Sequence, residues 1–128
     1  MKILATNGVR ITVENLYQSR YSKPTMGQYI FTYRITIENT NNFTVQLIRR
    51  HWNIKNAVGE SKVVSGEGVI GKQPILKPGE KHQYVSWCPL STPIGQMDGH
   101  YEMKAIPSGE TLLVDIPTFH LVALNILN

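Results

Sequence analysis

The residues with the clearest potential for chemistry are three glycines, Gly66, Gly68 and Gly71, which spell G-x-G-x-x-G. In a dinucleotide-binding fold, this spacing lets the backbone approach a pyrophosphate at the start of a helix. Here Lys72 and Pro74 follow the last glycine closely, so no helix with free amides can begin behind the motif. The sequence therefore predicts a tight, irregular connection with positive φ. The alternative is a nest of successive amides that binds an anion, with Lys72 as a counter-charge.

Arg50 is the second candidate, because strand alternation places it on the apolar face between Ile48 and Trp52. An inward guanidinium must be ion-paired or hydrogen-bonded. Glu67 is a candidate partner, so we expect either an internal pair or carbonyl contacts that fix the glycine segment. Ligand binding by Arg50 is the alternative.

Four histidines are scattered along the chain: His51, His82, His100 and His120. Their spacing contains no paired ligand motif such as H-x-x-x-H, and all except His82 are predicted to face away from the core. Cys88 is expected to be a small core residue, because no histidine arrangement supports a nucleophile there. The sequence therefore predicts no metal site, no cofactor and no catalytic machinery, and we expect a protein that is not an enzyme.

The composition indicates one domain over residues 1–128, a length that can bury one hydrophobic core without disulfides. The chain has a single cysteine, no signal-peptide pattern and no run near the ~20 apolar residues of a membrane span. We therefore expect a soluble protein of the cytoplasm. The net charge of +4 is spread along the chain, which mildly favours anionic partners but argues against nucleic-acid binding.

The elements that would position these residues follow from the alternation of apolar and polar residues. Residues 9–13 alternate and predict a first strand, and residues 29–38 give the cleanest strand signal in the chain. Residues 18–27 lack periodicity and contain proline and glycine, which predicts a loop. Residues 39–42 are rich in asparagine, which predicts a turn and, with the returning segment from Phe43, a hairpin.

The returning segment changes phase in its middle, which predicts a β-bulge near Leu47 and Ile48. With that register, Arg49 and His51 face outward. Residues 56–60 are expected to turn the chain into a further strand over residues 61–65.

The second half of the chain repeats this alternation of strands and turns. Lys77 to Glu80 is a turn signature that leads into a strand over residues 82–88, whose apolar residues follow no single phase. Residues 92–99 look like a loop, and residues 101–105 alternate again. The last strand pattern, residues 112–123, changes phase at a proline that is expected to interrupt an edge or bend the strand.

Seven or eight short strands without helical periodicity predict an all-β antiparallel sandwich of the immunoglobulin or fibronectin type III kind. Tyr101, soon after Asp98 and Gly99, is either a tyrosine corner or a core tyrosine. An exposed edge strand would also allow a homodimer.

The ordered motifs of the chain closely resemble those of the bacterial ApaG protein family. The resemblance extends over strand patterning from about Val9 to Leu124. It rests on Arg50-His51-Trp52, Gly66-Glu67-Gly68-Val69 with Gly71, Gln73 and Pro74, Pro78-Gly79, Thr92-Pro93 with Gly95 and Met97, and Gly99 with Tyr101.

This resemblance implies a fibronectin type III-like sandwich, in agreement with the strand count. It also implies a family-level link to cobalt tolerance and magnesium efflux. Eukaryotic relatives carry the domain in F-box and polymerase-interacting proteins, where it looks like a partner-binding module. The resemblance implies no settled biochemical activity.

We therefore expect a binding or accessory module with a protein partner. Recognition is expected at loops on a rigid sandwich, which selects the glycine segment from Gly66 to Pro74, Arg49 and His51, and the neighbouring Thr92 to Met97. The candidate binding residues are Gly66, Glu67, Gly68, Gly71, Lys72, Arg49, Arg50 and His51. One alternative is an anionic small molecule, such as phosphate, pyrophosphate or a nucleotide, bound at residues 66–71, and another is a metal-linked role.

Overall fold

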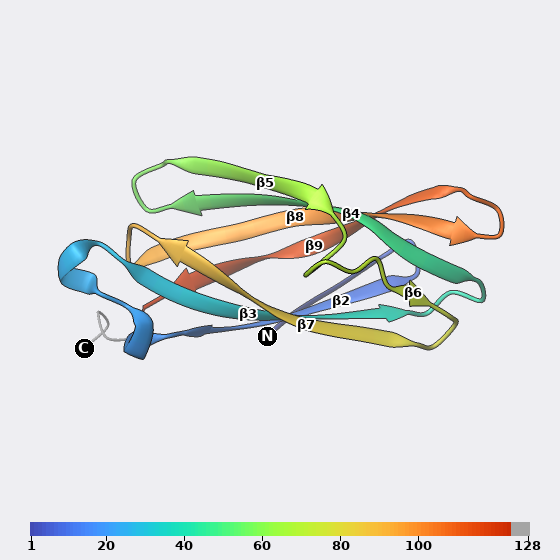
Figure 1. Ribbon diagram of the computed structural model, residues 1–128, viewed down its shortest axis with the longest axis horizontal. Coiled ribbons are helices and arrows are strands. Elements are labelled where there is room, and N and C mark those ends of the chain that lie inside the picture. The colour runs from blue at the N-terminus through green and yellow to red at the C-terminus, as the bar shows by residue number, and fades with distance from the viewer. Residues whose placement is uncertain (124–128) are drawn as a thin grey trace.

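The computed structural model describes residues 1–123, so Leu124, where the patterning of the resemblance ends, lies outside the described part. Two antiparallel sheets form a sandwich (Figure 1), as the sequence predicts. One sheet has the order β1 (Lys2–Thr6), β2 (Val9–Tyr17), β3 (Tyr29–Asn39) and β7 (Lys81–Leu90). The other has the order β5 (Ser61–Glu67), β4 (Thr44–Asn56), β8 (Ile94–Ile106) and β9 (Thr111–Val122), with β6 (Ile75–Leu76) beside β4.

The expected loop over residues 18–27 contains two short 3₁₀ turns, Ser19–Tyr21 and Pro24–Met26. None of the helical segments within residues 1–123 has the length and apolar character that crossing a membrane requires.

Alternating residues fill the space between the sheets, as the period of two predicts. Ile11 and Ile35 of the first sheet and Tyr101 of the second are fully buried. Tyr101 is a core tyrosine and not a tyrosine corner, because its hydroxyl shares a hydrogen bond with the hydroxyl of Tyr84 in the opposite sheet. This contact ties the two layers together through a polar pair in the core.

The prediction of a hairpin at residues 39–42 is wrong. β3 pairs with β2 and β7, whereas β4 pairs with strands of the other sheet, so the chain crosses between layers here. Asn39 is fully buried, and its Nδ2 donates to the carbonyls of Phe43 and Leu76 at 2.8 and 2.9 Å. Its Oδ1 accepts from the amide of Asn41 at 3.0 Å. The asparagine thus serves a crossover, which local turn chemistry cannot distinguish from a hairpin.

The prediction of a loop at residues 92–99 is also wrong over most of its length, because β8 begins at Ile94. The glycines in this segment serve close strand packing. A Cβ on Gly99 would lie 2.0 Å from the carbonyl oxygen of His51, and a Cβ on Gly95 would lie 2.6 Å from that of Lys55. β1 was missed because its residues are mostly exposed and give no buried alternation.

Both predicted irregularities of strand phase are present. The pairing of β4 with β8 shifts between Leu47 and Arg49, which confirms the bulge at Ile48. The pairing of β8 with β9 shifts between Met97 and Gly99, opposite the proline at position 117. The first shift sets the direction in which Arg49 and Arg50 point.

The two long sides of the sandwich differ. On one side β1 contacts β9, where Asn7 Nδ2 donates to the carbonyl of Leu113 at 2.7 Å. On the other side β5 and β7 end their sheets (Figure 1), and no hydrogen bond between these two strands occurs within residues 1–123. The sandwich is therefore closed along β1 and β9 and parted along β5 and β7.

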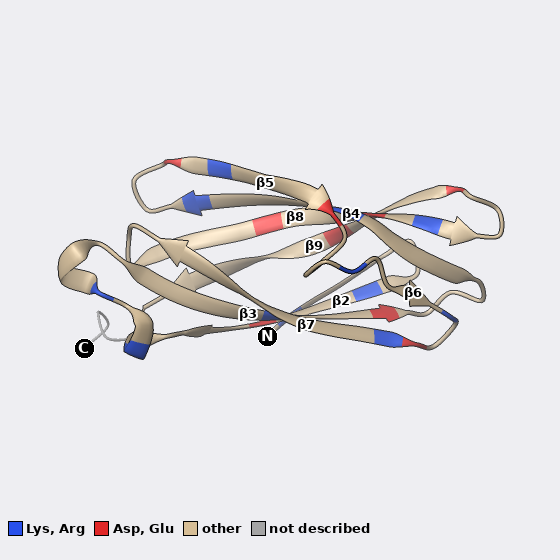
Figure 2. Ribbon diagram, in the orientation of Figure 1, with Lys and Arg blue, Asp and Glu red and all other residues tan. Residues whose placement is uncertain are grey.

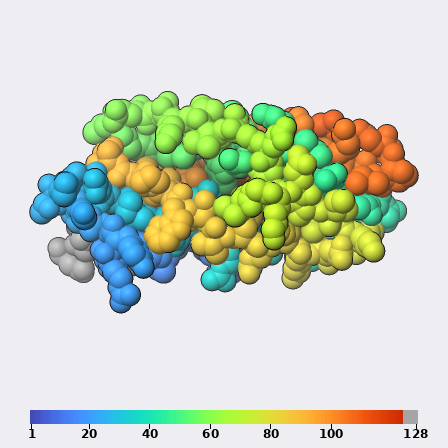
Figure 3. Space-filling view, viewed as in Figure 1, coloured from blue at the N-terminus to red at the C-terminus, as the bar shows by residue number. Residues whose placement is uncertain are grey.

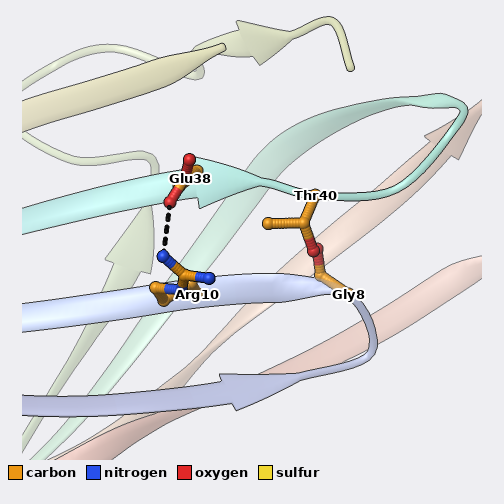
Figure 4. A network of polar contacts seen from close by, with 4 residues as sticks. All are labelled: Gly8, Arg10, Glu38 and Thr40. Carbon is orange, nitrogen blue, oxygen red and sulfur yellow. Dashed lines mark hydrogen bonds and ion pairs between the residues drawn. The ribbon is translucent and has the colours of Figure 1, made fainter. Parts of the chain in front are cut away.

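A small polar network supports the start of the first sheet (Figure 4). Arg10 Nη1 lies 3.2 Å from the Glu38 carboxylate, and Thr40 Oγ1 donates to the carbonyl of Gly8 at 2.7 Å. These contacts join β2 to the end of β3 beside the crossover. The Arg10 side chain of this ion pair is half exposed, so we assign the pair little stability.

We predict that Asn39→Ala lowers the free energy of unfolding by about 3 kcal/mol, because it leaves buried carbonyls without donors. Urea denaturation measures this loss, and a fall in Tm of roughly 10 °C accompanies it. The exposed Asn42 provides the control, for which Asn42→Ala is expected to change stability by less than about 0.5 kcal/mol. Equal effects of the two substitutions would contradict the role of Asn39 in the crossover.

Candidate functional site

A cleft of about 390 Å³ opens between the sheets on the side where β5 and β7 part. Figure 3 shows this side, with β5 in green above β7 in gold. The volume falls in the range of small-molecule and side-chain binding pockets. Its walls are Tyr33, Arg50, Trp52, Ile54, Lys62, Val64, Glu67, Val69, Ile70, Gly71, Tyr84, Ser86, Trp87, Cys88, Pro89 and Met97.

Arg50 projects into this cleft from β4, as its inward register predicts. Its Nη1 donates to the carbonyl oxygens of Glu67 and Gly68 at 2.9 and 3.0 Å. No carboxylate within residues 1–123 lies within 4.0 Å of the guanidinium. Of the two expectations for Arg50, the structure therefore has the carbonyl contacts and lacks the ion pair with the Glu67 carboxylate.

The reason for this arrangement is the pairing of Arg50 with Gly66 across β4 and β5. A Cβ on Gly66 would lie 3.2 Å from both Nη atoms, so the bare backbone of Gly66 lets the guanidinium lie close over β5. From there it reaches the main chain just beyond the end of the strand. Gly66 itself continues β5 and shows no positive φ, unlike the other two glycines of the motif.

The glycine segment is the predicted tight connection, and no helix follows it. Gly68, Ile70 and Gly71 have φ values of 64°, 48° and 72°. The amides of Gly68, Val69 and Lys72 donate to main-chain carbonyls of the protein at 2.8 to 3.0 Å. Most amides that an anion nest would use are therefore already engaged.

Aromatic side chains from three strands line the cleft around Arg50. Burial raises the pKa of the Tyr33, Tyr84 and Tyr101 phenols, and the charge of Arg50 opposes this shift only in part. The phenols therefore stay protonated at neutral pH. Trp52 packs edge-on against Tyr33, with ring centroids 5.3 Å apart, which keeps this wall rigid.

The lips of the cleft carry two large apolar side chains in contact with solvent. Trp87 of β7 is 53% exposed and packs edge-on against Tyr21. Ile70 of the glycine segment is 61% exposed and has a φ of 48°. A β-branched residue at positive φ is a backbone outlier with a cost of about 1–3 kcal/mol. Both lips thus present apolar surface to solvent.

The candidate residues divide between two faces of the second sheet. Arg50, Glu67 and Gly71 line the cleft, whereas Arg49 and His51 lie on the outer face. There His51 stacks on His100 with ring centroids 4.9 Å apart, beside a shallow depression of about 180 Å³. Within residues 1–123, no group of three or more His, Cys, Asp or Glu side chains is placed to hold a metal ion.

Thr92 and Lys72, both predicted to lie at the site, lie outside the cleft. Thr92 does not neighbour the glycine segment, because its Oγ1 accepts from the amide of Ala57 at the other end of β5. Only Met97 of that segment reaches the cleft. Lys72 is not among the cleft walls, and its charge adds to burial in lowering the pKa of His82.

Sequence reasoning missed the aromatic walls, because each residue looks like an ordinary core position in its own strand. One usable signal was present in β7, where Val85 and Trp87 are apolar on the phase opposite to Tyr84 and Cys88. Apolar residues on both phases of an edge strand indicate a second contact surface.

In the ribbon of Figure 2, charged residues are spread along the strands of both sheets. The cleft itself carries two cations, Arg50 and Lys62, and one anion, Glu67. The local balance is therefore positive.

Comparison with known proteins places these features in a family. A family model described as the ApaG domain matches residues 19–105. The chain is 45% identical over 116 residues to Protein ApaG from Brucella abortus (strain S19), covering 91% of this chain and 88% of that protein. It is 40% identical over 126 residues to Protein ApaG from Proteus mirabilis (strain HI4320), covering 98% and 100%. A crystal structure named for the ApaA protein from Bordetella pertussis has a TM-score of 0.86 at 39% identity, covering 89% of this chain and 92% of that one.

We predict that Gly68→Ala destabilises the fold far more than Gly71→Ala does. At Gly68 an added Cβ would lie 2.2 Å from the Lys72 carbonyl oxygen, whereas at Gly71 it would meet no atom within 4 Å. Both glycines have positive φ, so the conformational cost of about 1–2 kcal/mol is common to the two substitutions. Urea denaturation should show a loss of at least about 3 kcal/mol for Gly68→Ala. Similar losses would contradict the packing of this segment.

We also predict that the free energy of unfolding falls as the pH rises from 9 to 11. Burial raises the pKa of the Cys88 thiol from 9.0 to about 11, with partial opposition from the charge of Lys62. The folded state therefore favours the neutral thiol, and this stabilisation of roughly 3 kcal/mol is complete below pH 9 and is lost progressively as the pH rises from 9 to 11. Cys88→Ala should flatten the decline between pH 9 and 10 in urea titrations. An unchanged slope would contradict the assignment to Cys88.

Proposed function

We propose, from the premise that this chain belongs to the ApaG domain family, that it is a non-catalytic binding module whose partner protein docks in the cleft between β5 and β7. The observation that supports this proposal is the pair of exposed apolar lips, Trp87 and Ile70, around a cleft that contains a guanidinium. Tryptophan, other aromatics and arginine are the residues that most often dominate protein interfaces.

The backbone at Ile70 strengthens this proposal. An asparagine or glycine would adopt a φ of 48° more easily than isoleucine, and the side chain gains little burial in return. Strain of this kind persists mainly at functional sites. A partner that covers Ile70 would bury its side chain, which the fold of the chain alone leaves exposed.

A second candidate function is the binding of a phosphate, pyrophosphate or nucleotide at residues 66–71. It is favoured because, among the residues that the structure describes, Arg50 beside this segment has no carboxylate partner. Calorimetric titration with pyrophosphate and ATP tests it. The family-level link to cobalt tolerance and magnesium efflux makes Co²⁺ and Mg²⁺ the further titrants.

We predict that Ile70→Asn raises stability and weakens partner capture in the same molecule. Removing the strain should add about 1 kcal/mol to the free energy of unfolding. Removing the apolar contact should reduce capture from extracts of the native cell about tenfold, as measured by quantitative mass spectrometry. The control is Val58→Asn, because Val58 is 70% exposed in the turn between β4 and β5 and does not line the cleft. Equal capture by both variants would count against the cleft as the docking site.

A further inference from the structure

We infer that the partner segment is an extended acidic peptide, which pairs with the free edge of β5 and places one carboxylate on Arg50. This inference rests on the proposed function and names the chemistry of its ligand. Arg50 brings a permanent positive charge and a planar set of hydrogen-bond donors to the wall of the cleft.

The guanidinium of Arg50 has more hydrogen-bond donors than its contacts within residues 1–123 use. Its five N–H groups form a fixed fork, and the two hydrogen bonds that it makes within residues 1–123 both start at Nη1. These two bonds orient the group while its charge stays unneutralised. A carboxylate matches the planar geometry of the remaining N–H groups and can accept two parallel bonds from them.

The electrostatics of the cleft select for an anion. Arg50 and Lys62 outnumber Glu67 on its walls, and the charge of Arg50 acts on the phenols of Tyr33 and Tyr84. The guanidinium is only partly exposed. Attraction to a carboxylate is therefore stronger here than between two charges at the open surface.

The apolar lips and the strand edge favour a peptide over a free anion. β5 ends its sheet, so its outer main-chain groups are open to a further strand (Figure 1). Lys62 and Val64, which alternate along β5, line the cleft. An added strand would likewise turn every second side chain toward the cleft, so that an acidic residue can reach Arg50 while its apolar neighbours pack on Trp87 and Ile70.

A second copy of this chain fits the edge less well. A two-fold symmetric pairing of β5 with itself would bring the same patch of both copies together, including Lys62 and Arg50. Like charges would then meet across the interface. An acidic partner removes this repulsion.

The experiment starts with selection from a random peptide library displayed on phage, with the full chain as the target. The expected consensus is an acidic residue flanked by apolar or aromatic residues at alternate positions. The tightest peptide is then synthesised with its acidic residue unchanged or replaced by the amide, and both are titrated against the unchanged protein by fluorescence anisotropy. We expect the amide peptide to bind about 10- to 100-fold more weakly.

The matched protein variants are Arg50→Gln and Arg49→Gln, which remove the same charge from adjacent residues on opposite faces of β4. Only Arg50→Gln should abolish the preference for acid over amide. Because Arg50 also holds the carbonyls of Glu67 and Gly68, the amide peptide against the unchanged protein is the decisive comparison.

The inference would be overturned by the absence of any enriched peptide, by enrichment without an acidic residue, or by equal binding of the acid and amide peptides. Peptides without an acidic residue whose binding is lost in Ile70→Asn would leave the proposed function standing. Binding that neither Ile70→Asn nor Arg50→Gln affects would overturn both. Self-association of the full chain in sedimentation, with no enriched peptide, would assign the edge to a second copy.

Discussion

The structure of this site depends on one half-buried guanidinium that, within residues 1–123, is held by main-chain carbonyls and by no carboxylate. Arg50 reaches the carbonyls of Glu67 and Gly68 for two reasons. The bulge at Ile48 turns its side chain inward, and Gly66, its neighbour on β5, has no side chain to block the guanidinium. Its hydrogen bonds tie the glycine segment to β4. The same bonds leave a positive charge facing a cleft with aromatic walls, so one contact serves both the fold and the site.

Contacts outside β5 and the glycine segment hold the two layers of the sandwich together. Asn39 joins the layers at the crossover, the Tyr84 and Tyr101 hydroxyls meet in the core, and Asn7 closes the side of β1 and β9. These contacts allow β5 and β7 to remain apart. An exposed Ile70 at positive φ can then persist, because the rest of the fold tolerates its local cost.

Much of the fold follows from sequence because alternation reports burial directly, as in residues 29–38 and 101–105. The crossover at Asn39 could not be predicted, since one of its partners, Leu76, lies far along the chain in a strand of the other sheet. Gly95 and Gly99 gave their segment the composition of a loop, although close packing between strands is what requires these glycines. For the site, the inward direction of Arg50 and its carbonyl contacts were predictable from the strand register. The aromatic walls were not predictable, because they come from strands that are far apart in the chain and that only the sheet topology brings together.

The most direct test of the account is an NMR titration of the ¹⁵N-labelled full chain with the tightest acidic peptide from the selection. The chain has two tryptophans, Trp52 and Trp87, and both line the cleft, so their indole N–H signals report on binding there. The account predicts saturable shifts of both indole signals together with the amides of Lys62 and Ile70. Shifts confined to the outer face around His51 and His100, with both indole signals unchanged, would contradict it.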